Sequence, residues 1–457
     1  MNFLERFFKL RQNGTTVKTE VLAGVTTFMT MAYILAVNPS ILGNAGMDPG
    51  AVFTATALSS CLGTLLMGLL ANCPFVLAPG MGINAFFTYT IVGQMGYPWQ
   101  IGLVAVFVEG ILFVIMSMTK LRTAIFNCIP PALKFGVTSG IGLFITFIGL
   151  QNAKIVVDGV TLVRLYPFGA SLTDGSFYTT GIGALLALIG VVVTAILLEK
   201  KVTGGILWGI VFTWLLGMVC ELTGLYLPNP ELGMYSVMPD FSQGISIPSL
   251  APTFMQLDFS ALFTFNFLTV LMAVMFADLF NTIGTLIGVA SKANMLDENG
   301  KLPKIEKAFL ADSFATIIGA LLGTTTVTTF VESSAGVAVG GRTGLTAIVS
   351  AVLFILSMFF APIFLAIPAF ATAPALIIVG FMMLSCIMNI DFGDYTEAIP
   401  AFLAMIFMPF TYSICEGIAA GIISYVLLNI FAHRKGKSIS GVVYILAIIF
   451  LLKYILV

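Results

Sequence analysis

Charged residues are scarce in this sequence. Only 9% of its 457 residues are charged and 59% are hydrophobic, whereas a soluble domain carries about a quarter charged residues. The mean hydropathy of +1.06 agrees with this composition. The chain cannot cover itself with a water-facing surface, so most of it must face lipid or other parts of the protein. The net charge of −1 also gives no electrostatic reason to expect a nucleic-acid partner.

Histidine is nearly absent, and no cysteines are closely paired in the sequence. The single histidine, His433, lies in the basic run HRKGK, where a cytosolic charge cluster explains it. The cysteines form no C-x-x-C pair, which argues against a zinc site and a disulfide framework. They are dispersed through apolar segments, at Cys61, Cys73, Cys128, Cys220, Cys386 and Cys415. We therefore expect no metal and no cofactor. A membrane enzyme finds little support, because we identify no metal-ligand cluster and no nucleophile–base pair.

What the sequence does have is a series of apolar stretches of spanning or near-spanning length. The N-terminal segment is basic and amphipathic without a small-residue cleavage site, so we expect no cleaved signal peptide. We predict an all-α polytopic membrane protein of 14 transmembrane segments. The expected ranges are 19–42, 51–71, 76–94, 99–118, 123–150, 178–198, 202–224, 262–291, 307–323, 326–341, 343–366, 372–389, 397–412 and 414–432. A further apolar run at 439–456 either spans or lies along the interface.

The positive charges predict an orientation. With the N-terminus inside, 16 of the 20 basic residues fall in cytosolic segments, whereas Lys154 and Arg164 fall outside. The long loop at 225–261 carries Glu231, Asp240 and Asp258 but no Lys or Arg. This bias predicts a multi-pass protein of the cell membrane with a cytosolic N-terminus. The 16 residues are Arg6, Lys9, Arg11, Lys18, Lys120, Arg122, Lys200, Lys201, Lys292, Lys301, Lys304, Lys307, Arg342, Arg434, Lys435 and Lys437.

Faint internal similarity indicates an inverted repeat. The segment PPALKFGVTSGIGLF (130–144) echoes APALIIVGFMMLSC (373–386), and ILLEKKVTGGILWGI (196–210) echoes YSICEGIAAGIISYV (412–426). Two echoes in the same order are harder to attribute to chance than one. Seven segments per half means that the second half enters the membrane from the opposite side. Inverted repeats of this kind are typical of secondary transporters.

The predicted boundaries follow from this repeat. Residues 1–224 form the first repeat, 225–261 an extracellular connecting loop and 262–432 the second repeat. Residues 433–457 form a cytosolic basic cluster and a C-terminal apolar helix.

Two short segments, 72–93 and 323–344, do not read as ordinary spanning helices. Each begins with strand-favouring residues, PFVLAPG and TTTVTTF, and then turns into a helical stretch of small residues. Extended backbone at membrane depth is tolerated only where it is buried in protein or lines a cavity. We predict that the two segments pair as short antiparallel strands, with each half-helix aiming its N-terminal amides at a shared site. The alternative is two glycine-kinked spanning helices.

Ionisable residues inside predicted spans are candidates for function. Asp278 shares one helical stripe with Asn281, Thr282 and Thr285 at spacings of three, four and seven. Such a polar stripe lines a cavity or, alternatively, makes helix-to-helix hydrogen bonds without a ligand. Glu332 follows TTF at the start of the second half-helix, where the helix dipole favours its anion. Lys134 is a further ionisable residue inside a predicted span. Other acids have stronger structural explanations: Glu109 and Asp312 as partners of other bundle residues, and Glu199 and Glu416 as helix-junction residues.

Four long motifs resemble the nucleobase–cation symporter family 2, also called nucleobase–ascorbate transporters. The similarity is closest to its AzgA-like branch of adenine, guanine and hypoxanthine permeases, and it covers nearly the whole chain. The motifs are GVTTFMTMAYILAVNPSIL (24–42), APGMGINAFF (78–87), FADLFNTIGTLIGVA (276–290) and TTTVTTFVESSAGVAVGGRTGLTA (324–347). The resemblance implies a core domain of segments 1–4 and 8–11 and a gate domain of segments 5–7 and 12–14. It also implies substrate between the two domains, and a homodimer formed through the gate domain.

The resemblance carries three site residues over to this chain. The family's substrate-binding carboxylates fall on Asp278 and Glu332, and its polar residue of segment 3 falls on Asn84. Many relatives read DLFDT where this chain reads DLFNT, so Asn281 replaces a second, titratable acid of those relatives. The preferred purine, the coupling ion and its stoichiometry therefore stay open. Asn281 and Thr282 are expected to support the site.

A purine is a flat ring with hydrogen-bonding groups around its rim, so its pocket needs an aromatic face and a few polar groups. Glu332 as an anion can accept ring N–H bonds, Asn84 can both donate and accept, and the amides of Ser333 and Ser334 can donate. The stacking candidates are Phe86, Phe276 and Phe330. Burial disfavours a charged carboxylate, so Asp278 is the predicted proton carrier and Glu332 the substrate anchor, with exchanged roles as the alternative.

Two alternative hypotheses concern the coupling ion and the transported substrate. Sodium could replace the proton as the driving ion. Related inverted-repeat folds carry inorganic anions, which a half-helix N-terminus can bind, but the predicted pocket presents two carboxylates rather than a positive side chain. We therefore expect a transporter that imports purine nucleobases by proton symport, with membrane lipid around it.

Overall fold

The computed structural model describes residues 3–119, 121–122, 128–160, 162–229, 234–239, 246–292, 295, 302, 305–432 and 439–456. The helices of the first half are α1 (Phe3–Phe8), α2 (Val17–Met31), α3 (Ile34–Gly43), α4 (Pro49–Leu66), α5 (Met81–Ala85), α6 (Trp99–Met118), α8 (Pro131–Asn152), α9 (Phe168–Asp174), α10 (Gly181–Glu199) and α11 (Gly205–Leu222). Those of the second half are α12 (Phe265–Lys292), α13 (Ile305–Leu322), α14 (Ser333–Val339), α15 (Gly344–Ser357), α16 (Ala361–Leu365), α17 (Ala369–Leu384), α18 (Tyr395–Thr411), α19 (Ile414–Phe431) and α20 (Gly441–Leu456).

Two π-helical turns and four short strands complete the elements that position the site. The π-helical segment η2 (Met67–Ala71) continues α4, and η3 (Phe86–Gln94) continues α5. Strands β1 (Leu77–Pro79) and β4 (Val327–Thr329) form one pair, and β2 (Val156–Gly159) and β3 (Leu162–Leu165) form another. The β2–β3 hairpin lies in a connection for which the sequence predicted no strands.

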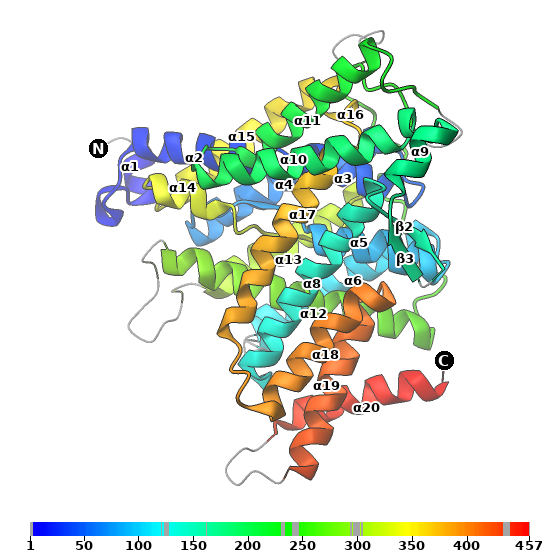
Figure 1. Ribbon diagram of the computed structural model, residues 1–457. Helices are drawn as coiled ribbons and strands as arrows, with labels where there is room; N and C mark the ends of the chain where they lie inside the picture. The colour runs from blue at the N-terminus through cyan, green and yellow to red at the C-terminus, as the bar shows by residue number, and fades with distance from the viewer. Residues whose placement is uncertain are drawn as a thin grey trace.

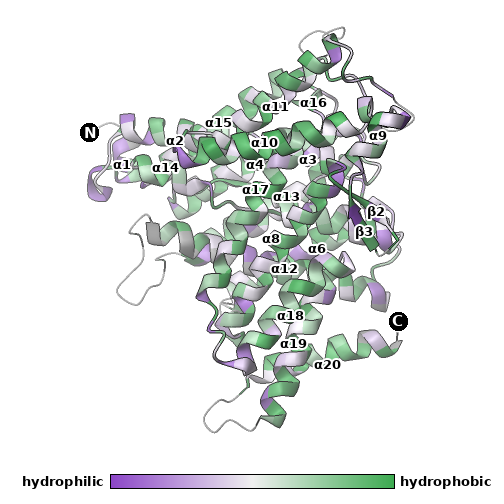
Figure 2. Cartoon of the chain, viewed as in Figure 1, coloured by the Kyte–Doolittle hydropathy of each residue, from purple (hydrophilic) through white to green (hydrophobic). Residues whose placement is uncertain are grey.

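The chain is built as a membrane protein. Within the described residues, nine helices are long and apolar enough to cross a membrane, and shorter apolar helices begin at Asn266, Tyr395 and Gly441. Hydrophobic residues colour most of the helical surface, and polar residues gather near α1 and the β2–β3 hairpin (Figure 2). The predicted polytopic all-α class is therefore confirmed. The run at 439–456 forms α20, which packs against α19 and α12.

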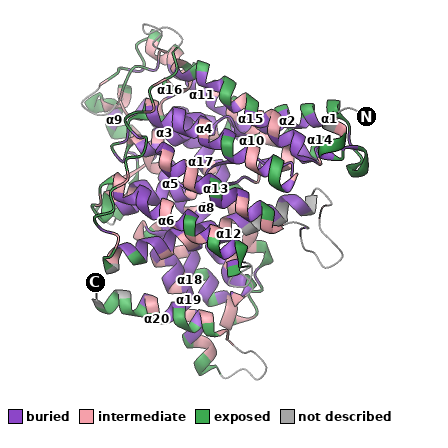
Figure 3. Cartoon of the chain, turned by 180° about the vertical axis from the view of Figure 1, so that it is seen from behind, coloured by how far each residue is buried: buried purple, intermediate pink, exposed green. Residues whose placement is uncertain are grey.

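The helices fall into two packing groups (Figure 1). The core group consists of α2, α3, α4, α5, α6, α13, α14 and α15 together with η2, η3 and the β1–β4 pair, and the gate group consists of α8, α10, α11, α17, α18 and α19. Helix α12 contacts members of both groups, including β4, α6, α8 and α19. Seen from behind, buried residues concentrate where the groups meet in the middle of the molecule (Figure 3).

Segments 3 and 10 are broken as predicted. Strands β1 and β4 pair antiparallel, with Leu77 opposite Thr329 and Pro79 opposite Val327. The Gly80 amide continues the pairing by donating to the Thr326 carbonyl over 2.9 Å. Strands of three residues form few backbone hydrogen bonds with each other, but threonine and valine favour extended backbone. The alternative of two kinked but continuous helices is thereby excluded.

The outer edges of this small sheet are satisfied by side chains. The Thr64 hydroxyl of α4 accepts from the Leu77 amide at 3.0 Å and donates to the Leu77 carbonyl at 3.2 Å. On the other edge, the Thr316 hydroxyl of α13 donates to the Val327 carbonyl at 3.2 Å. Unpaired backbone groups are costly where no water reaches them, so these threonines explain how a two-stranded sheet persists among apolar helices.

Some predicted features lie outside the described residues. These are the basic run at 433–438, Lys120, Lys301 and Lys304, and the acids Glu231 and Asp240 of the long connecting loop.

Glycines bring α8 and α17, the helices of the first sequence echo, into close contact. A Cβ atom added at Gly142 would lie 2.6 Å from the Gly380 carbonyl oxygen, and one added at Gly380 would meet the Gly142 carbonyl oxygen and the Thr146 hydroxyl. Helices in membranes associate through such close backbone approaches.

We expect Gly380→Ala to destabilise the protein by about 1–3 kcal/mol, because overpacking forces the backbones of α8 and α17 apart. Thermal unfolding of the purified protein in detergent measures the effect. Gly169→Ala is the control, since a Cβ atom there meets nothing within 4 Å. Equal melting temperatures for the two variants would contradict the packing argument.

Candidate functional site

The threonine-rich run before and through β4 presents hydroxyls to two different sides. Side chains alternate along a strand, so Thr326 and Thr328 point to one side and Thr325 to the other. Thr326 donates to Glu109 Oε2 of α6 over 2.7 Å, and Thr328 lies 2.5 Å from the Thr282 hydroxyl of α12. Thr325 donates to Asn84 Oδ1 of α5. The strand therefore separates a side containing acids from a side containing amides.

The amide side is a buried hydrogen-bond network. Asn84 Nδ2 donates to Asn38 Oδ1 of α3 at 2.6 Å, and Asn38 Nδ2 donates to the hydroxyls of Thr56 and Thr324 at 2.7 and 2.9 Å. Asn38 and Asn84 are fully buried. This network connects α3, α4 and α5 to the approach of β4. It holds the predicted residue Asn84 in one orientation, because both ends of its amide have partners.

Glu332 is the N-cap residue of α14 and lies in the turn after β4. Its carboxylate accepts a hydrogen bond from the Tyr33 hydroxyl at 2.7 Å, and its side chain keeps 7% exposure. The amides of Ser333 and Ser334 donate to the carbonyls of Phe330 and Val331 at 3.2 and 2.9 Å, within the turn. The Ser333 hydroxyl accepts from the Val76 amide at 3.0 Å. In this conformation the two amides named as ligand donors are therefore engaged inside the protein.

The acid side of β4 is organised around Arg122. Its Nη2 atom lies 3.2 Å from Asp278 Oδ2 and 3.0 Å from Asp312 Oδ2, and all three side chains are fully buried. The guanidinium lies against the rings of Phe113 and Phe309, 4.1 and 4.7 Å from their centroids. We refer to Arg122, Asp278 and Asp312 as the charge triad. It was not predicted: the charge pattern counted Arg122 among the basic residues of a cytosolic segment, whereas its side chain is buried inside the protein.

Thr282 connects the charge triad to the strand pair. Its hydroxyl donates to Asp278 Oδ1 at 2.8 Å, lies 3.4 Å from both Asp312 oxygens and is 2.5 Å from Thr328 Oγ1. Of the predicted polar stripe, Asp278 and Thr282 are buried in this network, whereas Asn281 is half-buried and its carbonyl accepts from Thr285. Within the described residues no hydrogen bond or ion pair joins Asp278 to Glu332. The two acids are connected through β4 and its hydroxyls rather than by direct contact.

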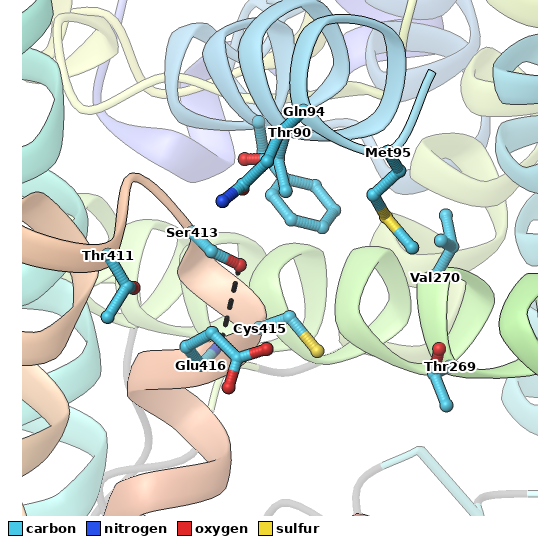
Figure 4. A pocket seen from close by; sticks show the side chains of 10 residues that line it. Thr90, Gln94, Met95, Thr269, Val270, Thr411, Ser413, Cys415 and Glu416 are labelled. Atoms are coloured by element: carbon cyan, nitrogen blue, oxygen red, sulfur yellow. Dashed lines mark hydrogen bonds between the residues drawn. The ribbon is translucent and has the colours of Figure 1, made fainter. Parts of the chain in front are cut away.

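A cavity of about 260 Å³ lies between the core and gate groups, next to α12 (Figure 4). Its polar lining comes from Thr90 and Gln94 of η3, Thr269 of α12, Thr411 at the end of α18, and Ser413 and Glu416 at the start of α19. Phe86, two residues beyond Asn84, contributes an aromatic ring.

The other two stacking candidates lie elsewhere. Phe276 lines a separate apolar cavity of about 100 Å³ together with Phe113, Met116 and residues of α20. Phe330 is buried at the start of the turn before Glu332. Of the three predicted aromatic residues, Phe86 is therefore the one next to the cavity between the groups.

Direct hydrogen bonds cross from the core group to the gate group beside this cavity. Thr90 donates to the Tyr412 carbonyl at 2.7 Å, and the Tyr89 hydroxyl donates to Asn152 Oδ1 at 3.0 Å. Tyr412 sits at the α18–α19 junction with a φ of 56° and packs edge-on against Tyr89 and Phe144. These contacts close the space between the groups on this side.

Sequence reasoning missed Tyr33, Asn38 and Arg122. Tyr33 and Asn38 lie in the motif at 24–42, but neither is charged, and nothing in their local pattern distinguishes them from packing residues. Arg122 follows a helix end at a place where basic residues are common. Only the approach of α12 and α13 gives it partners. The described residues contain no group of three or more His, Cys, Asp or Glu side chains that could hold a metal ion.

Helices in two packing groups, with two half-helices that meet at paired strands, define an inverted-repeat membrane transporter. The transmembrane domain of a cyanobacterial bicarbonate transporter, BicA, has the same fold, with a TM-score of 0.62, 15% identity, and coverage of 88% of this chain and 97% of that one. The sequence profile of the Permease family matches residues 18–420. The chain belongs to this family of nucleobase–ascorbate transporters, as the motifs predicted.

Relatives with assigned substrates match over almost the full length. The adenine permease AdeQ of Escherichia coli K12 is 41% identical, over 99% of this chain and 96% of the relative. The guanine/hypoxanthine permease PbuG of Bacillus subtilis 168 is 42% identical, over 99% of both chains. The chain is thus a multi-pass membrane permease and not an enzyme.

Proposed function

We propose that this protein imports purine nucleobases by proton symport, with the core group moving against the gate group. The observation that carries the proposal is the charge triad behind β4, together with Glu332 in the turn that follows this strand. One short strand then connects a group that binds protons to a group that binds substrate. Adenine, guanine and hypoxanthine are the candidate substrates, because relatives of nearly equal identity carry these names.

Substrate recognition is assigned to Glu332, Asn84 and Phe86. Glu332 accepts N–H groups of the purine ring, and a charge-assisted bond of this kind is stronger than a neutral one. For this, the Tyr33 hydroxyl must share the carboxylate with the ligand, which binds at the second oxygen. Asn84 exchanges one of its internal bonds for a rim group of the purine, and Phe86 offers its ring as a stacking face. Ser333 and Ser334 contribute amides once the turn before α14 opens.

Proton coupling is assigned to Asp278 together with Asp312. Among the described residues, Arg122 is the only cation within ion-pairing distance of either acid. Two buried aspartates and one guanidinium leave one negative charge uncompensated, and an uncompensated buried charge is costly. A shared proton removes that cost. Because Thr282 joins Asp278 to Thr328, the gain or loss of this proton changes the hydrogen bonding of β4, which ends three residues before Glu332.

An anion cargo is the second candidate, since the BicA fold is the same. The arrangement of Arg122 argues against it. The guanidinium is fully buried, paired with two aspartates and covered by two phenylalanine rings. It therefore offers no free positive charge to a sulfate or bicarbonate ion.

We expect an inward proton gradient to accumulate purine in proteoliposomes with the membrane potential clamped. One pH unit and a tenfold concentration ratio represent the same free energy, so accumulation should be about tenfold per pH unit for each proton carried. Radiolabelled adenine, guanine and hypoxanthine are tested in parallel, with sodium equal on both sides. Excess unlabelled purine should abolish uptake, whereas excess sulfate or bicarbonate should not.

Other results would change the proposal. Accumulation that follows an imposed sodium gradient, and not the pH gradient, would make this protein a sodium symporter. Uptake that sulfate or bicarbonate inhibits but purines do not would support the anion alternative.

Orientation and assembly belong to the same proposal. We assign the N-terminus to the cytosol, residues 1–224 and 262–432 to the two repeats, and the gate group to a homodimer interface. The support is the distribution of basic residues in the sequence and the family resemblance described above.

A further inference from the structure

Glu109 is a buried acid that the proposed mechanism does not use. It lies in the middle of α6, and its side chain has no exposure to solvent. One carboxylate oxygen, Oε2, accepts the Thr326 hydroxyl at 2.7 Å. The other, Oε1, is buried and has no hydrogen-bond partner within the described residues. An ionised carboxylate in this position would have half of its acceptor capacity unsatisfied, away from water.

More acidic than basic side chains surround Glu109. Helix α6 packs against α13, α12 and η3. The charged groups whose fields reach Glu109 are Asp278 of α12, Asp312 of α13 and Arg122. Tyr89 is the ionisable side chain of η3, and its hydroxyl is engaged with Asn44 and Asn152. Arg122 is already shared by two aspartates, so it does not neutralise a third carboxylate.

We propose that Glu109 binds a coupling proton of the transport cycle, in addition to the proton shared by Asp278 and Asp312. The inference rests on the proposed proton symport. The proton binds at Oε1 when the site opens to the side of entry and leaves from Oε1 when the site opens to the other side. No covalent bond of the purine changes, and one proton crosses the membrane per purine through this residue.

The geometry explains how this proton is linked to the substrate. Thr326 holds Glu109 with its hydroxyl, and its carbonyl accepts the amide of Gly80, the N-cap residue of α5. Three residues beyond Thr326, the chain leaves β4 and enters the turn that carries Glu332. Ionisation of Glu109 therefore acts on a backbone position that joins the start of α5 to the strand leading to Glu332.

The test compares Glu109→Gln with the unmodified protein in proteoliposomes. Glutamine keeps the shape and the acceptor oxygen for Thr326 but cannot release a proton. Exchange of internal unlabelled purine for external labelled purine should continue, because exchange needs no net proton movement. Accumulation driven by a pH gradient should fall by about tenfold per pH unit relative to the unmodified protein, which is the contribution of one proton. Glu199→Gln, which removes an exposed acid at the end of α10, is the matched control and should behave like the unmodified protein.

The outcomes separate this inference from the proposed function. If Glu109→Gln accumulates purine as steeply with pH as the unmodified protein, the inference is overturned and Glu109 is a structural acid. If the unmodified protein exchanges purine but accumulates none in a pH gradient, proton symport fails, and the inference fails with it.

A second variant keeps the test valid if Glu109→Gln does not fold. Thr326→Val retains a strand-favouring residue and removes the described donor to Glu109. The protonated form of Glu109 is then favoured, and half-maximal uptake should move to a pH higher by about one unit. An unchanged pH profile in a normally inserted Thr326→Val protein would also overturn the inference.

Discussion

Replacing Glu332 by glutamine is expected to reduce purine uptake roughly 100-fold, to background, while the protein still reaches the membrane. The carboxylate accepts the Tyr33 hydroxyl at 2.7 Å and stands at the N-cap of α14. Glutamine retains the shape but loses the negative charge, and hydrogen bonds to charged groups contribute about 1.5–3 kcal/mol. Initial uptake of radiolabelled purine in cells, normalised to the amount of protein in the membrane fraction, measures the loss.

Two further variants test whether Glu332 binds substrate or only supports the fold. Tyr33→Phe removes the internal donor but leaves the carboxylate, so we expect it to retain uptake with an altered KM. Glu221→Gln changes an acid that bonds to Ser236 and Val237 in the connecting loop, and it should have no effect on uptake. Normal uptake by Glu332→Gln would remove Glu332 from the substrate site and with it the recognition scheme proposed above.

Replacing Arg122 by glutamine is expected to be the most damaging change to stability. It leaves Asp278 and Asp312 buried without a cation, and breaking a buried ion pair by removing one partner costs about 3–5 kcal/mol. The stacking of the guanidinium between Phe113 and Phe309 is lost as well. We expect a strongly reduced melting temperature in detergent and little protein in the membrane fraction.

A second substitution should restore much of this loss. In the double variant Arg122→Gln/Asp312→Asn, the second change replaces one acid by a neutral amide that can donate to Asp278, so the buried charge falls from two to one. The double variant should therefore be more stable than Arg122→Gln alone, and the difference measures the coupling within the charge triad. If Asp312→Asn instead adds its own destabilisation to that of Arg122→Gln, the triad is not held by charge balance. Uptake by the rescued protein then reports whether Arg122 has a role in transport beyond stability.

Local sequence determined the class of this protein. A chain with 9% charged residues and repeated apolar stretches of about 20 residues forms helices in lipid, because a helix satisfies its own backbone hydrogen bonds there. The run TTTVTTF predicted a strand at membrane depth because β-branched residues favour extended backbone, and β4 confirms it. The motifs at 276–290 and 324–347 predicted the permease family, and Asn84, Asp278 and Glu332 were selected from such motifs.

Tertiary structure decided which of these groups meet. Arg122 lies 156 residues from Asp278 and 190 from Asp312 in the chain, and Tyr33 lies 299 residues from Glu332. No local pattern encodes contacts of that range, because they arise from the packing of α12, α13 and α3 around a two-stranded sheet. A basic residue after a helix looks the same in sequence whether water or two aspartates surround it. Burial makes the difference, since a guanidinium removed from water must find anions, and only the folded chain supplies them.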